Sequence, residues 1–173
     1  MTWIAPEVDR VRVRPQPDEG ASLRATLAFN RQTLLLKCAG LTHDQLVMRS
    51  VPPSRLSLLG LVRHMTDVER WWFRTNLRGE RLEGIFGPDD NLEGDFEDLD
   101  SASAEDVFIA YAEECAAADA AATGLPLTTT FRGLSREYEL DLRWVYQHMI
   151  EEYARHNGHA DLLRECIDGV VGY

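Results

Sequence analysis

The strongest chemical signal in this 173-residue sequence is a pair of potential metal ligands near its C-terminal end. Glu152 and His156 stand four residues apart in a segment with helical periodicity, so their side chains lie next to each other on one face. On a helical wheel both fall within the apolar stripe, close to Val145 and Met149. Because an isolated buried carboxylate is costly, Glu152 needs a cation, a hydrogen-bond donor or a metal beside it. This i, i+4 spacing lets two helical residues bind one ion.

Two further histidines flank the pair. His148 also stands four residues from Glu152, but it lies about 12 Å along the helix from His156, so we do not expect all three to reach one ion at bond lengths of about 2 Å. We expect His148 and His159 to support the site, by orienting a ligand or shuttling a proton. The third ligand must then come from another helix. His64 is the candidate, because it falls on the apolar stripe of its own predicted helix.

Two histidines and one glutamate form a ligand set of catalytic zinc sites, where one position stays open for water, a thiolate or a substrate oxygen. We therefore predict that His64, Glu152 and His156 bind a divalent metal ion. Zinc is the first candidate and nickel the second. The order Glu-x-x-x-His differs from the His-Glu-x-x-His of metalloproteases and argues against a peptidase. The alternative is a non-catalytic metal- or small-molecule-binding bundle, in which the same side chains form a polar network that stabilises two helices.

Four long periodic segments must position these residues, at about 18–39, 55–77, 103–124 and 140–168. Without a strong strand pattern, they predict an all-α fold, a four-helix bundle with long connections. Ser54 and Ser103 can cap the second and third helices. Gly158 interrupts the fourth at a cost of about 1 kcal/mol, which indicates a close helix contact. The order of up and down helices stays open.

The connections carry weaker signals. Residues 1–17 predict an extended arm because prolines limit any strand. Residues 41–53 and 79–101 predict loops, the second unusually long, and residues 128–131 predict a brief extended stretch. The consecutive Trp71, Trp72 and Phe73 cannot all face the core, so one of them should line a pocket or an interface.

An acidic run at 89–100 partly fits a calcium-binding EF-hand loop. Gly94 stands at its sixth position, but Asp100 replaces the usual glutamate at the twelfth, and flanking helices are missing or late. We favour a solvated acidic loop that borders the metal site.

Composition excludes several classes of function. A formal net charge of −11 repels a phosphate backbone, so we expect no nucleic-acid partner. No run approaches the roughly 18 apolar residues of a membrane span, and the N-terminus does not resemble a signal peptide, so we expect no membrane partner and a cytoplasmic location. Cys38, Cys115 and Cys166 are widely and irregularly spaced, which predicts buried free thiols. The length predicts one domain over 1–173.

Two segments resemble the DinB/YfiT-like metalloenzyme superfamily, namely LVRHMTDVERWWF at 61–73 and HMIEEYARHNGHAD at 148–161. The resemblance covers nearly the whole chain. It is closest to an actinobacterial branch of unknown function, related to mycothiol-dependent maleylpyruvate isomerases and mycothiol transferases. It implies a four-helix bundle with one metal ligand on the second helix and two on the last. The histidine, glutamate and histidine of those isomerases correspond to His64, Glu152 and His156.

The resemblance also implies a thiol-dependent transferase or isomerase. In such an enzyme the metal lowers the pKa of a low-molecular-weight thiol, such as mycothiol, and presents it to a small electrophilic substrate. The additional C-terminal domain of the isomerases has no counterpart here, so their specific substrate is not expected. A homodimer is a further expectation.

Overall fold

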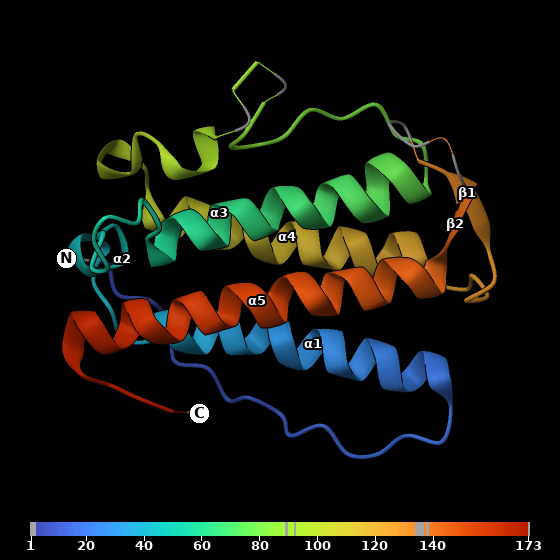
Figure 1. The fold of residues 1–173 in the computed structure, drawn as a ribbon, viewed down its shortest axis with the longest axis horizontal. Coiled ribbons are helices and arrows are strands. Elements are labelled where there is room, and N and C mark those ends of the chain that lie inside the picture. Colours follow the sequence, from blue (N-terminus) through green and yellow to red (C-terminus); the bar gives the residue numbers. More distant parts are fainter. Residues whose placement is uncertain (1–2, 89, 92, 134–136, 138, 173) are drawn as a thin grey trace.

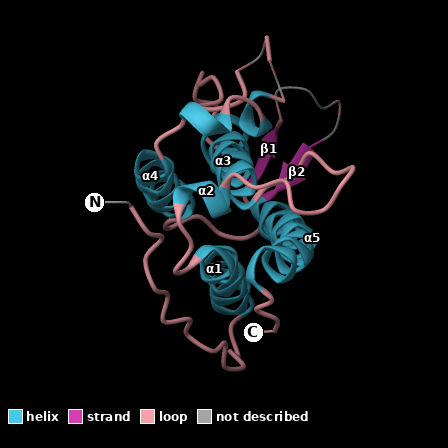
Figure 2. Cartoon of the chain, turned by 90° about the vertical axis from the view of Figure 1, so that its left-hand side faces the viewer, coloured by secondary structure: helices cyan, strands magenta, loops and turns pink. Residues whose placement is uncertain are grey.

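Four long helices form the molecule, with one small two-stranded sheet at an end (Figure 1). The computed structural model describes residues 3–172 apart from 89, 92, 134–136 and 138. The α3 helix runs directly into a π-helical segment, η1. The bounds are α1 Glu19–Cys38, α3 Leu58–Glu69, η1 Arg70–Leu77, α4 Ala104–Ala122 and α5 Leu142–Asp168. Viewed end-on, the long helices surround a common core (Figure 2). The predicted all-α bundle is confirmed.

The direction of the helices explains the longest connection. Helices α1 and α5 run one way, and α3 and α4 run the other way (Figure 1). Since α3 and α4 pack together and are parallel, the chain must return along the bundle between them, a distance of about 30 Å for twenty helical residues. Residues 79–101, predicted as a loop, make this crossover and contain two short 3-10 turns, η2 (Gly94–Phe96) and η3 (Leu99–Ser101).

Side-chain caps set the helix starts. Ser103 caps α4 as predicted, accepting a hydrogen bond from the amide of Asp106. The predicted cap at Ser54 is wrong, because its hydroxyl accepts from the amide of Leu56 within the preceding turn. Ser57 caps instead, and α3 begins three residues later than expected, at Leu58.

Two short elements were missed. The predicted loop at 41–53 contains a one-turn helix, α2 (His43–Leu46), whose Thr42 and Gln45 form a capping box. The expected extended stretch at 128–131 is part of a hairpin, in which β1 (Thr130–Arg132) pairs with β2 (Glu139–Asp141). The second strand delays the start of α5 to Leu142.

The N-terminal segment packs against the outside of the bundle. Ala5 pairs with the backbone of Gly40 and Leu41 at the end of α1. Farther on, the Arg10 guanidinium lies 4.4 Å from the centre of the Phe29 ring. These contacts make the segment run back along α1 toward its start.

A buried polar network joins all four long helices. Arg31 of α1 donates two hydrogen bonds of 2.7 Å to the carboxylate of Glu69 on α3, and a third of 2.8 Å to Asp119 on α4. The hydroxyl of Tyr153 on α5 donates to Glu69 at 2.8 Å and lies 2.9 Å from the hydroxyl of Tyr111 on α4. Burial raises the pKa of Glu69, and the two-pronged contact with Arg31 opposes this shift by stabilising the carboxylate.

The predicted close contact at Gly158 is wrong. This residue is exposed on α5, and a Cβ added there would meet no atom within 4 Å. The glycine therefore lowers the stability of the helix, and no neighbouring element uses the space left by the missing side chain.

We expect Gly158→Ala to stabilise the protein by about 0.5–1 kcal/mol, because alanine loses less backbone entropy when the helix forms. Urea unfolding of the two proteins measures this difference. A destabilised variant would show that Gly158 has a structural role.

The sequence predicted three buried thiols, and one of them is exposed in the structure. Cys38 is buried and Cys115 is largely covered, but Cys166 is exposed near the end of α5.

Among the described residues, no helix has the length and apolar character needed to cross a membrane.

Candidate metal centre

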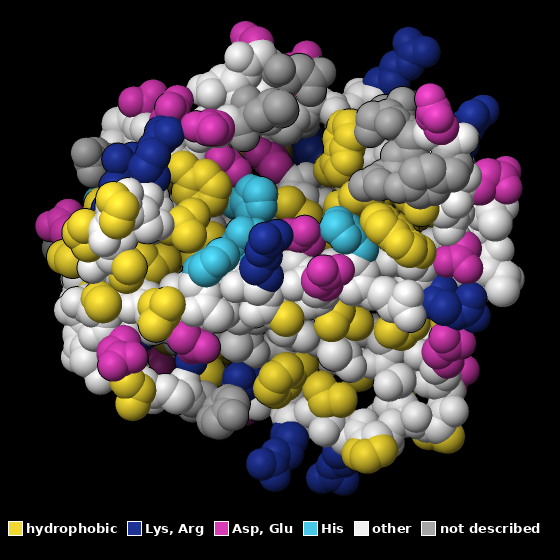
Figure 3. Space-filling view, in the orientation of Figure 1, with side chains coloured by type: hydrophobic (Ala, Val, Ile, Leu, Met, Phe, Trp, Pro, Cys, Tyr) yellow, Lys and Arg dark blue, Asp and Glu magenta, His cyan; other side chains and the backbone are white. Residues whose placement is uncertain are grey.

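The structure brings His64 of α3 together with Glu152 and His156 of α5. One potential ligand atom from each lies within 4.8 Å of the other two. The imidazole rings of His64 and His156 are 4.8 Å apart, centre to centre. In the space-filling view, histidines gather in a hollow with acidic side chains beside them (Figure 3). All three side chains predicted as ligands therefore meet between the two helices.

The geometry of this group fits a tetrahedral ion after small side-chain rotations. With bonds of about 2.0–2.2 Å, donor atoms around such an ion are roughly 3.4 Å apart. The distance between His156 Nε2 and Glu152 Oε2 is already 3.4 Å. The side chains are partly exposed, at 28% for His64, 22% for Glu152 and 13% for His156. A ligand from solvent can thus reach the position that the protein leaves open.

The protonation state of His156 favours metal binding. Burial lowers the pKa of His156 to about 4, and His64, His159 and Arg155 act in the same direction. The ring is therefore neutral near pH 7 and keeps a lone pair for an ion. His156 Nδ1 lies 3.4 Å from His159 Nδ1, so His159 is placed to orient the ring through its second nitrogen.

His148 lies on the other side of Glu152. Its Nε2 atom is 3.9 Å from Glu152 Oε1. The ring stacks on Trp144 at 4.8 Å and meets Trp72 edge-on at 4.7 Å. These aromatic contacts fix its position next to the carboxylate.

Asp95 is a site residue that the sequence analysis missed. Its Oδ2 atom lies 2.7 Å from His64 Nδ1, and the residue is only 4% exposed. A carboxylate at Nδ1 holds the proton there and leaves Nε2 with its lone pair for a metal. In the sequence, Asp95 was only one acid of the possible calcium loop, and no local spacing connects it to His64.

Contacts with α3 hold Asp95 in place. Arg63 donates to the carbonyl oxygens of Gly94 at 2.9 Å and Glu97 at 2.8 Å. The ring of Phe96 packs so closely on Gly60 that an added Cβ would come within 2.6 Å of it. The glycine therefore lets η2 approach the helix one turn before His64.

Three acidic side chains of the possible EF-hand, those at positions 93, 95 and 97, have other partners. Arg55 pairs with Glu93 at 3.0 Å and with Glu97 at 3.1 Å. Asp95 is buried against His64 rather than solvated. Asp89, Leu92 and the side chain of Asp100 lie outside the part of the chain that the structure describes. The described part of this segment does not form a calcium-binding arrangement, although it borders the candidate metal centre.

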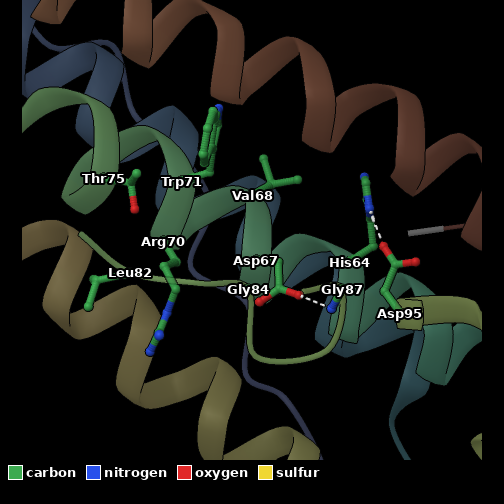
Figure 4. A pocket seen from close by; sticks show the side chains of 10 residues that line it. All are labelled: His64, Asp67, Val68, Arg70, Trp71, Thr75, Leu82, Gly84, Gly87 and Asp95. Atoms are coloured by element: carbon green, nitrogen blue, oxygen red, sulfur yellow. Dashed lines mark hydrogen bonds and ion pairs between the residues drawn. The ribbon is translucent and has the colours of Figure 1, made fainter. Parts of the chain in front are cut away.

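A cavity of about 510 Å³ has one of the three potential ligands, His64, in its wall, together with Asp95 (Figure 4). Trp71 also lines it, while Trp72 and Phe73 are buried, which confirms that one of the three aromatic residues faces a pocket. Asp67 holds the crossover beside this cavity, because its carboxylate accepts hydrogen bonds from the amides of residues 85–87.

A family model described as mycothiol-S-transferase matches residues 22–169. The match includes all four long helices apart from the first turn of α1, and it contains the three candidate ligands. A comparison with curated proteins gives no match. Since the model covers most of the sequence, the chain belongs to the mycothiol S-transferase family.

Proposed function

We propose that this protein is a metal-dependent thiol S-transferase in which His64, Glu152 and His156 hold a divalent ion. Zinc suits two imidazoles and one carboxylate, and nickel is the second choice. The observation that carries the proposal is the meeting of these three side chains, one of which, His64, also lines a cavity large enough for a small substrate. The family to which the chain belongs supports the thiol as one reactant.

A bound zinc ion would lower the pKa of a coordinated thiol and keep it as a thiolate near neutral pH. Around it, Asp95 holds His64, and His159 and His148 lie next to His156 and Glu152. His148 and His159 are placed to take up the proton that the thiol releases. The sulfur would then form a bond to an electrophilic carbon. In a substitution, the leaving group departs with the bonding electrons; in an addition to a double bond, the neighbouring carbon takes up a proton.

The nucleophile comes from a separate molecule, such as mycothiol. Burial raises the pKa of both Cys38 and Cys115 to about 12, so these thiols stay protonated. Cys166 lies on α5 more than two turns beyond His156 and does not line the cavity. Low-molecular-weight thiols are kept reduced in the cytoplasm, so we place the reaction there.

Metal analysis followed by a transfer assay tests this function. We expect protein purified without chelator to contain about one zinc or nickel ion per chain, and chelation to lower its melting temperature. Loaded protein should accelerate conjugation of mycothiol to a small electrophile, and chelated protein should not. Bound metal without transfer would favour the non-catalytic alternative. Protein that neither contains metal nor melts higher when zinc or nickel is added would contradict both.

A further inference from the structure

The cavity beside the candidate metal centre follows one face of α3 and η1. His64, Val68, Trp71 and Thr75 recur at three- and four-residue steps and all line it. In Figure 4, His64, Val68 and Trp71 project from the same side of the helix. The stripe from His64 to Thr75 spans eleven residue steps, roughly 16 Å in helical geometry. The cavity is therefore elongated, with the candidate metal ligand His64 at one end and Thr75 at the other.

Thr75 has an unusual hydroxyl group. The residue is only 2% exposed, and its Oγ1 atom has no hydrogen-bond partner within the part of the chain that the structure describes. A buried hydroxyl without a partner destabilises the folded protein. The position at the end of a cavity suggests that a ligand supplies the missing partner.

The π-helical geometry explains why this hydroxyl is free. Threonines inside helices commonly bond to the carbonyl oxygen four residues earlier, as Thr66 does with Val62 at 2.8 Å. For Thr75 that carbonyl belongs to Trp71, and it accepts a hydrogen bond of 2.8 Å from the Asn76 side chain instead. π-Helical segments are rare and occur often at functional sites.

Two charged side chains along the cavity have their polar atoms engaged by other groups, whereas Asp95 Oδ1, at the His64 end, is a second buried atom without a partner among the described residues. Asp67 accepts three backbone hydrogen bonds of 2.6–2.9 Å. Arg70 donates to Glu114 at 3.0 and 3.1 Å and to the carbonyl of Glu83. Between these groups the wall is apolar, formed by Val68, Trp71 and Leu82. This lining suits an apolar body without charge.

We propose that this cavity binds the electrophilic substrate, and that the electrophile is uncharged and elongated, with an aromatic or aliphatic body and a carbonyl-type oxygen that accepts a hydrogen bond from Thr75. The assignment rests on the proposed thiol transfer. We assign the cavity to the electrophile and not to the thiol because cellular low-molecular-weight thiols carry several polar groups. Each of these groups would need a hydrogen-bond partner, and the cavity wall offers too few.

Two unreactive probes test the assignment without the transfer reaction. 4-Phenyl-2-butanone has an aromatic body and a methyl ketone at the far end of its chain, and butylbenzene has the same length without the oxygen. We expect chelated wild-type protein to bind the ketone more tightly in ligand-observed NMR titrations. Thr75→Val should weaken ketone binding about 3- to 10-fold, in the range of one hydrogen bond, and change butylbenzene binding less than about 2-fold.

Thr66→Val is the matched control, because Thr66 is buried on the same helix but does not line the cavity. It should lower the melting temperature and leave both probe affinities unchanged. Thr75→Val should melt at or above the wild-type temperature, since it removes a hydroxyl without a partner. Trp71→Ala provides a second test and should weaken both probes.

Three results would overturn the assignment: no saturable binding of either probe, equal binding of both by wild type, or full ketone affinity in Thr75→Val. Because the probes need neither metal nor thiol, such a result leaves the proposed transfer to its own metal and activity measurements. Conversely, a protein that lacks metal but discriminates between the probes would contradict the transferase, and the cavity would then be a binding site for a carbonyl compound of the same shape without a role as electrophile.

Discussion

His64→Ala is expected to lose its bound metal while keeping its helices. The substitution removes one of the three candidate ligands, whereas loss of a supporting residue alone typically costs 10–100-fold in metal affinity. We therefore expect at least about 100-fold weaker binding and less than a tenth of the wild-type metal content after dialysis. Because the side chain is 28% exposed, its loss leaves little buried space. Elemental analysis gives the metal content, and far-ultraviolet circular dichroism gives the helix content.

Two further variants make the result specific. His43→Ala removes a histidine from α2, outside the candidate metal centre, and should retain the wild-type metal content. Asp95→Asn keeps the size of the side chain but removes the charge that faces His64 Nδ1, so it should weaken binding by about 10–100-fold. If His64→Ala retains as much metal as His43→Ala, His64 is not a ligand.

Glu69→Ala is expected to destabilise the protein by about 3–5 kcal/mol, the usual cost of removing one partner from a buried ion pair. Arg31 would lose both of its 2.7 Å hydrogen bonds to the carboxylate, and the Tyr153 hydroxyl would lose its acceptor. Asp119 would remain as a partner for Arg31, but its side chain is 62% exposed. Urea unfolding monitored by circular dichroism measures the loss.

Glu80→Ala is the control for the removal of an exposed ion pair. Glu80 pairs with Arg74 at 2.7 Å, but its side chain is 40% exposed, so the expected cost is below about 1 kcal/mol. The double variant Arg31→Met, Glu69→Leu should recover part of the stability lost in Glu69→Ala, because it leaves no unpaired guanidinium in the core. Equal costs for Glu69→Ala and Glu80→Ala would show that the buried network contributes no more than a surface pair.

The sequence by itself determined the features that depend on neighbouring residues. Helical periodicity predicted the four long helices to within about three residues at their starts. The same geometry placed Glu152 and His156 next to each other, since residues four apart share a helix face. Short-range hydrogen bonding identified the cap at Ser103. These features need no information about which helices are neighbours.

Only the tertiary structure decided how distant segments meet. The 3.4 Å between Glu152 and His156 follows from one helix, but the 2.7 Å between Asp95 and His64 requires the crossover to lie over α3. Likewise, no local pattern pairs Arg31 with Glu69. Such contacts depend on helix order and packing, which side-chain periodicity does not specify. The sequence thus predicted the candidate ligands, and the tertiary structure supplied the carboxylate behind His64 and the cavity beside it.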